Sequence, residues 1–162
     1  MPYLKTFIFT IFVPGTVAGA LPWLLITSDI KFLDAKLGAF RFIGAPIWAI
    51  GLLIYILCAW EFASTGRGTP APNDPPKALV AKGLYRFSRN PMYVGILSLI
   101  AGEAVFFESP LTALYGVIIF LLFNAFIIFY EEPTLNRMFE ESYKQFCKST
   151  PRWIGKINSR KT

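Results

Sequence analysis

The sequence contains no histidine and only two cysteines, and these absences exclude whole classes of chemistry. Histidine is the commonest general base near neutral pH and the commonest metal ligand in proteins. Cys58 lies in an apolar run and Cys147 in a charged segment, so we expect the two thiols to lie at different depths and to remain unpaired. Two separated cysteines cannot complete a zinc site. Zinc chemistry and Ser/His/Asp chemistry are therefore excluded, and we expect no bound metal.

Charged residues are also scarce, at 16% of the chain, whereas 54% of the residues are hydrophobic. A typical soluble domain has roughly 25% charged and 45–50% apolar residues. The excess of apolar side chains therefore indicates a membrane protein. Because the chain has 162 residues and no Gly/Ser-rich linker, it predicts a single membrane domain over residues 1–162.

Four apolar stretches predict membrane-spanning helices, at residues 4–26, 40–63, 91–108 and 111–130. Each is near the ~20 residues that a helix needs to cross roughly 30 Å of hydrocarbon. A cleavable signal is the alternative for the first stretch, since Lys5 precedes an apolar region and Ala18-Gly19-Ala20 offers small residues. Its hydrophobicity continues to Ile26, which is longer than the core of a signal, so we expect a retained span.

The basic residues predict the orientation of these spans. If the N-terminus is inside, 13 of the 16 basic residues fall in inner segments, and only Lys31, Lys36 and Arg41 lie outside. The positive-inside rule then places both termini in the cytoplasm, and we expect a prokaryotic cell membrane. Nucleic-acid binding is the other interpretation of a formal charge of +6, but attraction of flanking cations to anionic headgroups explains it more simply. We expect membrane lipids, and no nucleic acid, as partners.

The segments between and after the spans also have distinct patterns. Residues 64–77 are rich in glycine and proline and predict a stiff, extended inner loop, and residues 78–90 predict a segment at the membrane interface. Beyond Tyr130, apolar side chains recur at helical spacing between charged ones, namely Leu135, Met138, Phe139, Tyr143 and Phe146. The fold class predicted is an all-α polytopic membrane bundle of about four transmembrane helices plus an amphipathic C-terminal cytoplasmic helix.

The small residues of the third span have two interpretations. Gly95, Ser98 and Gly102 fall on one helical face, where they allow a neighbouring helix to approach closely. A ligand pressed against the same bare backbone is the functional alternative.

Ionisable groups inside or beside a bilayer are costly, so each is a candidate for a functional site. Glu61 and Glu103 are each explained by structural roles, as an end residue and as a buried hydrogen-bonding group. The adjacent pair Glu131 and Glu132 differs, because two carboxylates repel one another unless cations compensate. Arg89, Arg152 or a cationic ligand could supply that charge. Asn124 lies seven residues before Glu131 on the same helical face, which indicates a polar stripe that faces the bundle.

Three motifs occur in order: residues 83–95, GLYRFSRNPMYVG; residues 131–135, EEPTL; and Tyr143 followed by Pro151-Arg152-Trp153. Together they resemble the isoprenylcysteine carboxyl methyltransferase family and related membrane enzymes, including phospholipid methyltransferases. The resemblance covers about residues 64–155. It implies an S-adenosylmethionine-dependent methyltransferase without a Rossmann domain, whose cofactor pocket is built by the last two spans, the preceding loop and the C-terminal helix.

The resemblance also implies site residues. The cofactor-binding set that we predict, with the polar residue Asn124 added, is Arg89, Asn90, Pro91, Tyr93, Gly95, Gly102, Asn124, Glu131 and Glu132; Glu131, Glu132 and Arg152 are the candidate catalytic residues. Acidic side chains can neutralise the sulfonium and ammonium of S-adenosylmethionine, and an arginine can hold its carboxylate. Asn90 stands where many isoprenylcysteine methyltransferases have histidine, although an amide can still form hydrogen bonds.

The predicted activity is methyl transfer to a lipid-like or prenylcysteine-like acceptor that enters from the bilayer. A prenylcysteine-like acid, a phospholipid amine, a quinone-like ring and a fatty acid all remain open as the acceptor. The main alternative is a catalytically silent membrane scaffold or lipid-binding protein that retains the fold. A transporter is a third interpretation, disfavoured because the four spans show no repeat and no midplane charge pair.

Overall fold

The computed structural model describes residues 8, 12–28, 30, 33, 36–66 and 78–154, and within them every regular element is helical. The all-α prediction is therefore confirmed for this part of the chain. The proline-rich loop predicted at residues 64–77 lies mostly outside the described residues, as do the start of the first predicted span and the C-terminal tail.

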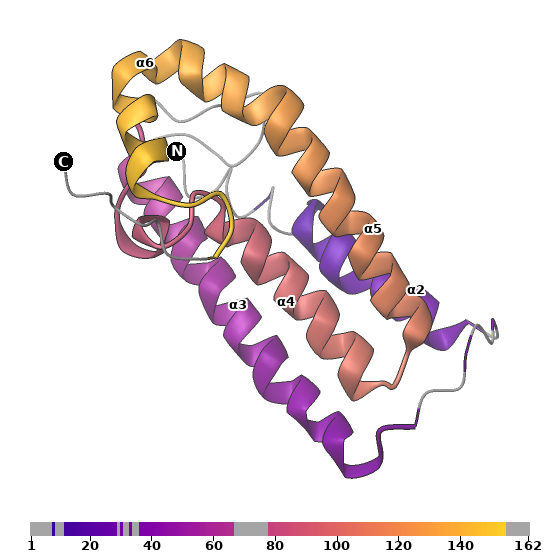
Figure 1. Ribbon diagram of the computed structural model, residues 1–162. Coiled ribbons are helices and arrows are strands. Elements are labelled where there is room, and N and C mark those ends of the chain that lie inside the picture. Colours follow the sequence, from indigo (N-terminus) through magenta and orange to yellow (C-terminus); the bar gives the residue numbers. More distant parts are fainter. Residues whose placement is uncertain are drawn as a thin grey trace.

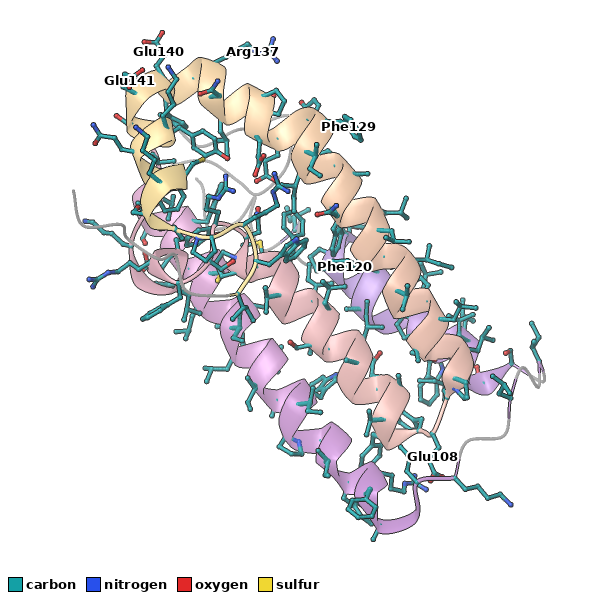
Figure 2. All side chains as sticks on the ribbon, in the orientation of Figure 1. Glu108, Phe120, Phe129, Arg137, Glu140 and Glu141 are labelled. Atoms are coloured by element: carbon teal, nitrogen blue, oxygen red, sulfur yellow. The ribbon has the colours of Figure 1, made fainter. Side chains whose placement is uncertain are left out.

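Three long helices form the body of the bundle (Figure 1): α3 (Gly44–Glu61), α4 (Pro91–Phe106) and α5 (Pro110–Phe126). α4 lies between the other two. A short 3-10 helix, η2 (Gly38–Ile43), leads into α3, and the shorter α2 (Leu21–Thr27) packs against α5. The last helix, α6 (Glu132–Ser149), arches over one end of the bundle, where Figure 2 labels Glu140 and Glu141.

Two helices are long and apolar enough to cross a membrane, Gly38–Ser64 and Pro110–Ser149. Two further apolar helices, Thr16–Thr27 and Pro91–Phe106, are shorter. The described residues thus support two of the predicted spans by length and composition, and four spans remain a prediction.

Glycines hold α3 and α4 together. A Cβ atom on Gly51 would lie 2.8 Å from the carbonyl oxygen of Gly95, and a Cβ on Gly44 would lie 2.5 Å from that of Gly102. The two glycines of each helix are seven residues apart, so they lie two turns apart on one face of each antiparallel partner. The close approach of the two backbones therefore depends on all four glycines.

The turn between α4 and α5 is short, as the sequence predicts. Glu108 adopts a left-handed φ of 52°, and the Ser109 hydroxyl caps α5 by accepting a hydrogen bond from Thr112 N at 3.2 Å. The Glu108 carboxylate accepts hydrogen bonds from Leu37 N at 2.6 Å and Gly38 N at 3.0 Å. We call this end of the bundle the Glu108 end, and the end covered by α6 the Glu132 end (Figure 2).

Two widened helical turns precede prolines. The π-helices η1 (Thr16–Ala20) and η5 (Ile127–Glu131) each end two residues before a proline, Pro22 and Pro133. In both, the residue before the proline donates to the carbonyl five residues back. A proline ring clashes with the carbonyl four residues earlier in an α-helix, and the wider turn relieves that clash. A third π-helix, η3 (Phe62–Gly66), follows α3.

Candidate functional site

The segment before α4 reaches the Glu132 end through the short 3-10 helix η4 (Gly83–Arg86). Gly83 has a left-handed φ of 54°, and a Cβ there would lie 2.6 Å from Glu61 Oε1. Glycine therefore serves both the backbone conformation and the close approach to the end of α3. Tyr85 is buried, and this burial raises the pKa of its phenol well above the ordinary range, so the hydroxyl stays protonated.

The segment before α4 is tied to the segment after α6 by three hydrogen bonds, and a fourth lies within the segment before α4. Arg89 N donates to Pro151 O at 2.8 Å, and Asn90 Nδ2 donates to Arg152 O at 3.0 Å. The Ser88 hydroxyl donates to the same Arg152 carbonyl at 3.3 Å and accepts from Asn90 N at 3.0 Å. Asn90 is only 6% exposed, and Pro91 then opens α4 in its first position, where a missing N–H is no loss. Asn90 and Pro91 thus build the framework of the site.

Glu132 neutralises two arginines. Arg152 donates to both carboxylate oxygens, with Nε at 2.8 Å and a terminal nitrogen at 2.9 Å, and Arg89 lies 3.0 Å away. Such a two-pronged contact is among the strongest charge-assisted interactions in proteins. Hydrogen bonding to Glu132 raises the pKa of Arg152, so this guanidinium stays charged.

Glu131 has a different environment, although it is the adjacent residue. Its Oε2 accepts a hydrogen bond from the Tyr93 hydroxyl at 2.9 Å, and no cation pairs with it among the described residues. The sequence left two kinds of partner open for the acidic pair, an arginine or a cationic ligand. Among the described residues, only Glu132 has arginine partners. Glu132 forms the ion-pair cluster, whereas Glu131 accepts the Tyr93 hydrogen bond and has no arginine partner among the described residues.

A cavity of about 120 Å³ lies beside Glu131. Each of the three π-helices contributes one of its walls, through Val17 of η1, Phe62 of η3 and Glu131 of η5. π-Helical turns occur frequently at functional sites. The remaining lining includes four residues with polar side-chain groups, Tyr85, Arg89, Asn90 and Tyr93, and five apolar residues, Val13, Pro14, Met92, Ile96 and Phe123.

Five of the nine predicted cofactor-binding residues do not line this cavity, namely Pro91, Gly95, Gly102, Asn124 and Glu132. Asn124 accepts a hydrogen bond from Trp153 Nε1 at 3.2 Å, which holds the segment after α6 against α5. Trp153 also packs on the ring of Phe120, which Figure 2 labels, with centroids 5.1 Å apart. Gly95 and Gly102 face α3, as the packing interpretation of the small residues predicts.

Sequence reasoning missed Cys147, which we expected to be an unpaired filler residue. Its thiol is not in a disulfide, but Sγ accepts a hydrogen bond from Arg89 at 2.8 Å, and the same guanidinium nitrogen donates to the Tyr143 hydroxyl at 3.5 Å. Tyr143 and Cys147 are four residues apart, so they share one face of α6. The four-residue spacing of Tyr143 and Cys147 is the sequence signal that could have indicated a shared partner for these two side chains.

A family model described as phospholipid methyltransferase matches residues 40–142. The chain belongs to the phospholipid methyltransferase family. Two curated relatives from Arabidopsis thaliana, protein-S-isoprenylcysteine O-methyltransferase A and B, are 32% and 30% identical to this chain over 80 residues. The resemblance that the motifs predict is thereby confirmed.

The aligned 80 residues cover 49% of this chain and 41% of each relative. The chain thus matches about two fifths of the length of these methyltransferases. No solved structure matches it. The phospholipid methyltransferase match includes Glu131 and Glu132, whereas Val17 and Arg152 lie outside it.

Proposed function

We propose that this protein is an integral membrane methyltransferase that uses S-adenosylmethionine and methylates a lipid-like acceptor. The observation that carries the proposal is Glu131, a partly buried carboxylate without a cationic partner among the described residues, in the wall of a cavity. A carboxylate that is shielded from water and has no cationic partner is suited to bind a cationic ligand. Membership of the phospholipid methyltransferase family supports a methyl sulfonium as that cation.

The polar residues that line the cavity suit the charged end of this donor. Arg89 lines the cavity, and its buried Nε has no partner among the described residues, so it can donate to the donor's carboxylate. Glu131 balances the positive charge, and Tyr93 fixes the orientation of the Glu131 carboxylate. Glu132 and Arg152 hold Arg89 and the surrounding segments in place. In this proposal Glu132 and Arg152 position the site, and Glu131 contacts the donor.

The size of the cavity adds a requirement. Pockets that hold drug-sized ligands measure roughly 300–1,000 Å³, so about 120 Å³ accommodates only the reacting groups. Binding of the whole donor therefore requires the surrounding elements to move apart.

When bound, S-adenosylmethionine supplies a methyl group on a sulfonium: a lone pair of the acceptor forms the new bond to carbon, the C–S bond breaks, and its electron pair stays on sulfur. The apolar walls of the cavity exclude water and align the acceptor. A carboxylate acceptor needs no base. An amine acceptor must lose a proton, and Glu131 is the nearest group that could take it.

The apolar residues that line the cavity, among them Val17, Phe62 and Phe123, support an acceptor with a hydrocarbon part that arrives from the bilayer. The distribution of basic residues supports a cytoplasmic location for the Glu132 end.

Donor binding is the first test. Titration of the purified protein with S-adenosylmethionine in a calorimeter should show one site per chain, and the demethylated product should compete for it. Ligand binding to the folded state should also raise the melting temperature. No heat and no thermal shift at millimolar donor would contradict the proposal and favour a silent scaffold.

A further inference from the structure

A second cavity, of about 240 Å³, lies toward the Glu108 end of the bundle between α3 and α4. Its lining includes Gly44 and Gly102 and three aromatic residues, Trp48, Phe106 and Phe107. Its one acidic wall is Glu103, twelve residues along α4 from Pro91 and therefore about 18 Å away at 1.5 Å per residue. This cavity is thus separate from the Glu131 site.

Glu103 is incompletely paired. Oε1 accepts a hydrogen bond from Trp48 Nε1 at 3.3 Å, whereas the buried Oε2 has no partner among the described residues. Aromatic rings around a carboxylate form a site for an organic cation, because ring faces and the carboxylate both attract positive charge. An acid at this depth of an apolar bundle is otherwise costly.

Arg41 lies over the ring of Phe106, one of the cavity's lining residues, with its guanidinium carbon 5.4 Å from the ring centroid. Its Nε also lacks a partner among the described residues, and its only ion pair there is a long one to Glu108, at 3.7 Å. Arg41 would repel a simple cation. A ligand that carries an anionic group next to its cation satisfies both Arg41 and Glu103.

We propose that this cavity binds the headgroup of a zwitterionic phospholipid, with its ammonium against Glu103 and the aromatic rings and its phosphate toward Arg41. The acyl chains would extend along the exposed apolar surface of α3, where Ile50 and Leu53 are more than half exposed. The lipid is not the methyl acceptor, because this cavity is lined by the last residues of α4 and the Glu131 cavity by the first.

The test is lipid titration of the detergent-solubilised protein, with bound lipid counted by native mass spectrometry. The probes are phosphatidylethanolamine and phosphatidylglycerol, which share a phosphate and differ in the ammonium. We expect one tightly retained phosphatidylethanolamine, and weaker binding of phosphatidylglycerol by about tenfold or more. Equal affinity for the two lipids would overturn the proposal.

Two variants locate the site. Glu103→Gln removes the charge, and Ala45→Phe fills the cavity from its exposed rim while it leaves the acid in place. Each should lower the affinity for phosphatidylethanolamine by about tenfold or more, whereas Glu141→Gln, the same change at an exposed acid of α6, should not. If Glu103→Gln fails to fold, the affinity of Ala45→Phe for phosphatidylethanolamine still tests the assignment. Retained affinity in Ala45→Phe, or in a folded Glu103→Gln, would contradict the assignment.

Discussion

Separate replacement of Glu131 and Glu132 with glutamine distinguishes a ligand contact from a structural ion pair. Glu132→Gln leaves two arginines without their counter-ion, Arg89 at 13% and Arg152 at 34% side-chain exposure. Removal of one partner of a buried pair costs roughly 3–5 kcal/mol. We expect about 3 kcal/mol, because solvent screens the partly exposed Arg152. In a chain of this size that loss lowers the melting temperature by roughly 6–12 °C.

Glu131→Gln should act in the opposite way. It strands no cation, and the amide oxygen can still accept the hydrogen bond from Tyr93, so the melting temperature of the empty protein should stay within about 2 °C of wild type. The affinity for S-adenosylmethionine should fall about tenfold to a hundredfold, the value of one charge-assisted contact. Because the sulfonium loses its charge as the reaction proceeds, Glu131 stabilises the bound donor more than the transition state. With an acceptor that needs no base, the variant should therefore raise KM and leave kcat unchanged or higher; with an amine acceptor, loss of the base should also lower kcat.

The assay is thermal melting without ligand and calorimetric titration with donor, on both variants and on Glu141→Gln as a matched surface control. Glu141 pairs with Lys144, and its side chain is 75% exposed, so its loss should change neither quantity. A lowered melting temperature with unchanged donor affinity in Glu131→Gln would refute the site assignment. A Glu132→Gln protein as stable as wild type would refute the ion-pair explanation.

Three further changes test the framework. Gly51→Ala should lower the stability of the protein by roughly 1–3 kcal/mol, measured by thermal melting, because the new Cβ meets the backbone of α4. Gly19→Ala is the control that should not lower stability, because nothing lies within 4 Å of its new Cβ. Tyr93→Phe should weaken donor binding in calorimetry by several-fold, because it removes the only hydrogen bond to the Glu131 carboxylate among the described residues. Unchanged affinity would show that the orientation of this carboxylate is unimportant. Trp153→Phe should cost about 1 kcal/mol in melting experiments through loss of its hydrogen bond to Asn124, and an undiminished stability would mean that this contact does not hold the segment.

Much of the helical framework could be predicted from the sequence, because runs of apolar residues and short proline-marked turns are local signals. Residues 91–108 and 111–130 correspond to α4 and to α5 with η5. The motif order also predicts that Arg89, Glu132 and Arg152 belong to one region, and the structure brings their side chains together.

The division of roles between Glu131 and Glu132 could not be predicted in this way. Adjacent residues of a helix point about 100° apart, and only the packing of α6 and the segment that follows it decides which carboxylate meets the arginines. The same holds for Val17, which reaches the cavity because Tyr115 donates a hydrogen bond to its carbonyl at 2.8 Å. Pro22 lies five residues after Val17, the spacing of a π-helical hydrogen bond, but proline has no N–H to donate to the Val17 carbonyl. The hydrogen bond to this carbonyl therefore comes from Tyr115, which is distant in the sequence.

The glycines show the limit of a periodic pattern. Gly95 and Gly102 are two helical turns apart, so they identify a face of α4 that a neighbour approaches closely. The spacing alone does not tell whether that neighbour is another helix or a ligand. The structure has Gly51 and Gly44 of α3 on that face. Identification of the neighbour requires the matching spacing in the second helix.

Transfer of the methyl group is the most direct test of the proposed activity. The purified protein is incubated with S-adenosylmethionine that carries a labelled methyl group and with a total membrane lipid extract, and the lipid fraction is analysed for label. The account predicts a labelled lipid, formed more slowly by Glu131→Gln at low donor concentration. Absence of label in every lipid, with folded protein and donor in excess, would contradict it.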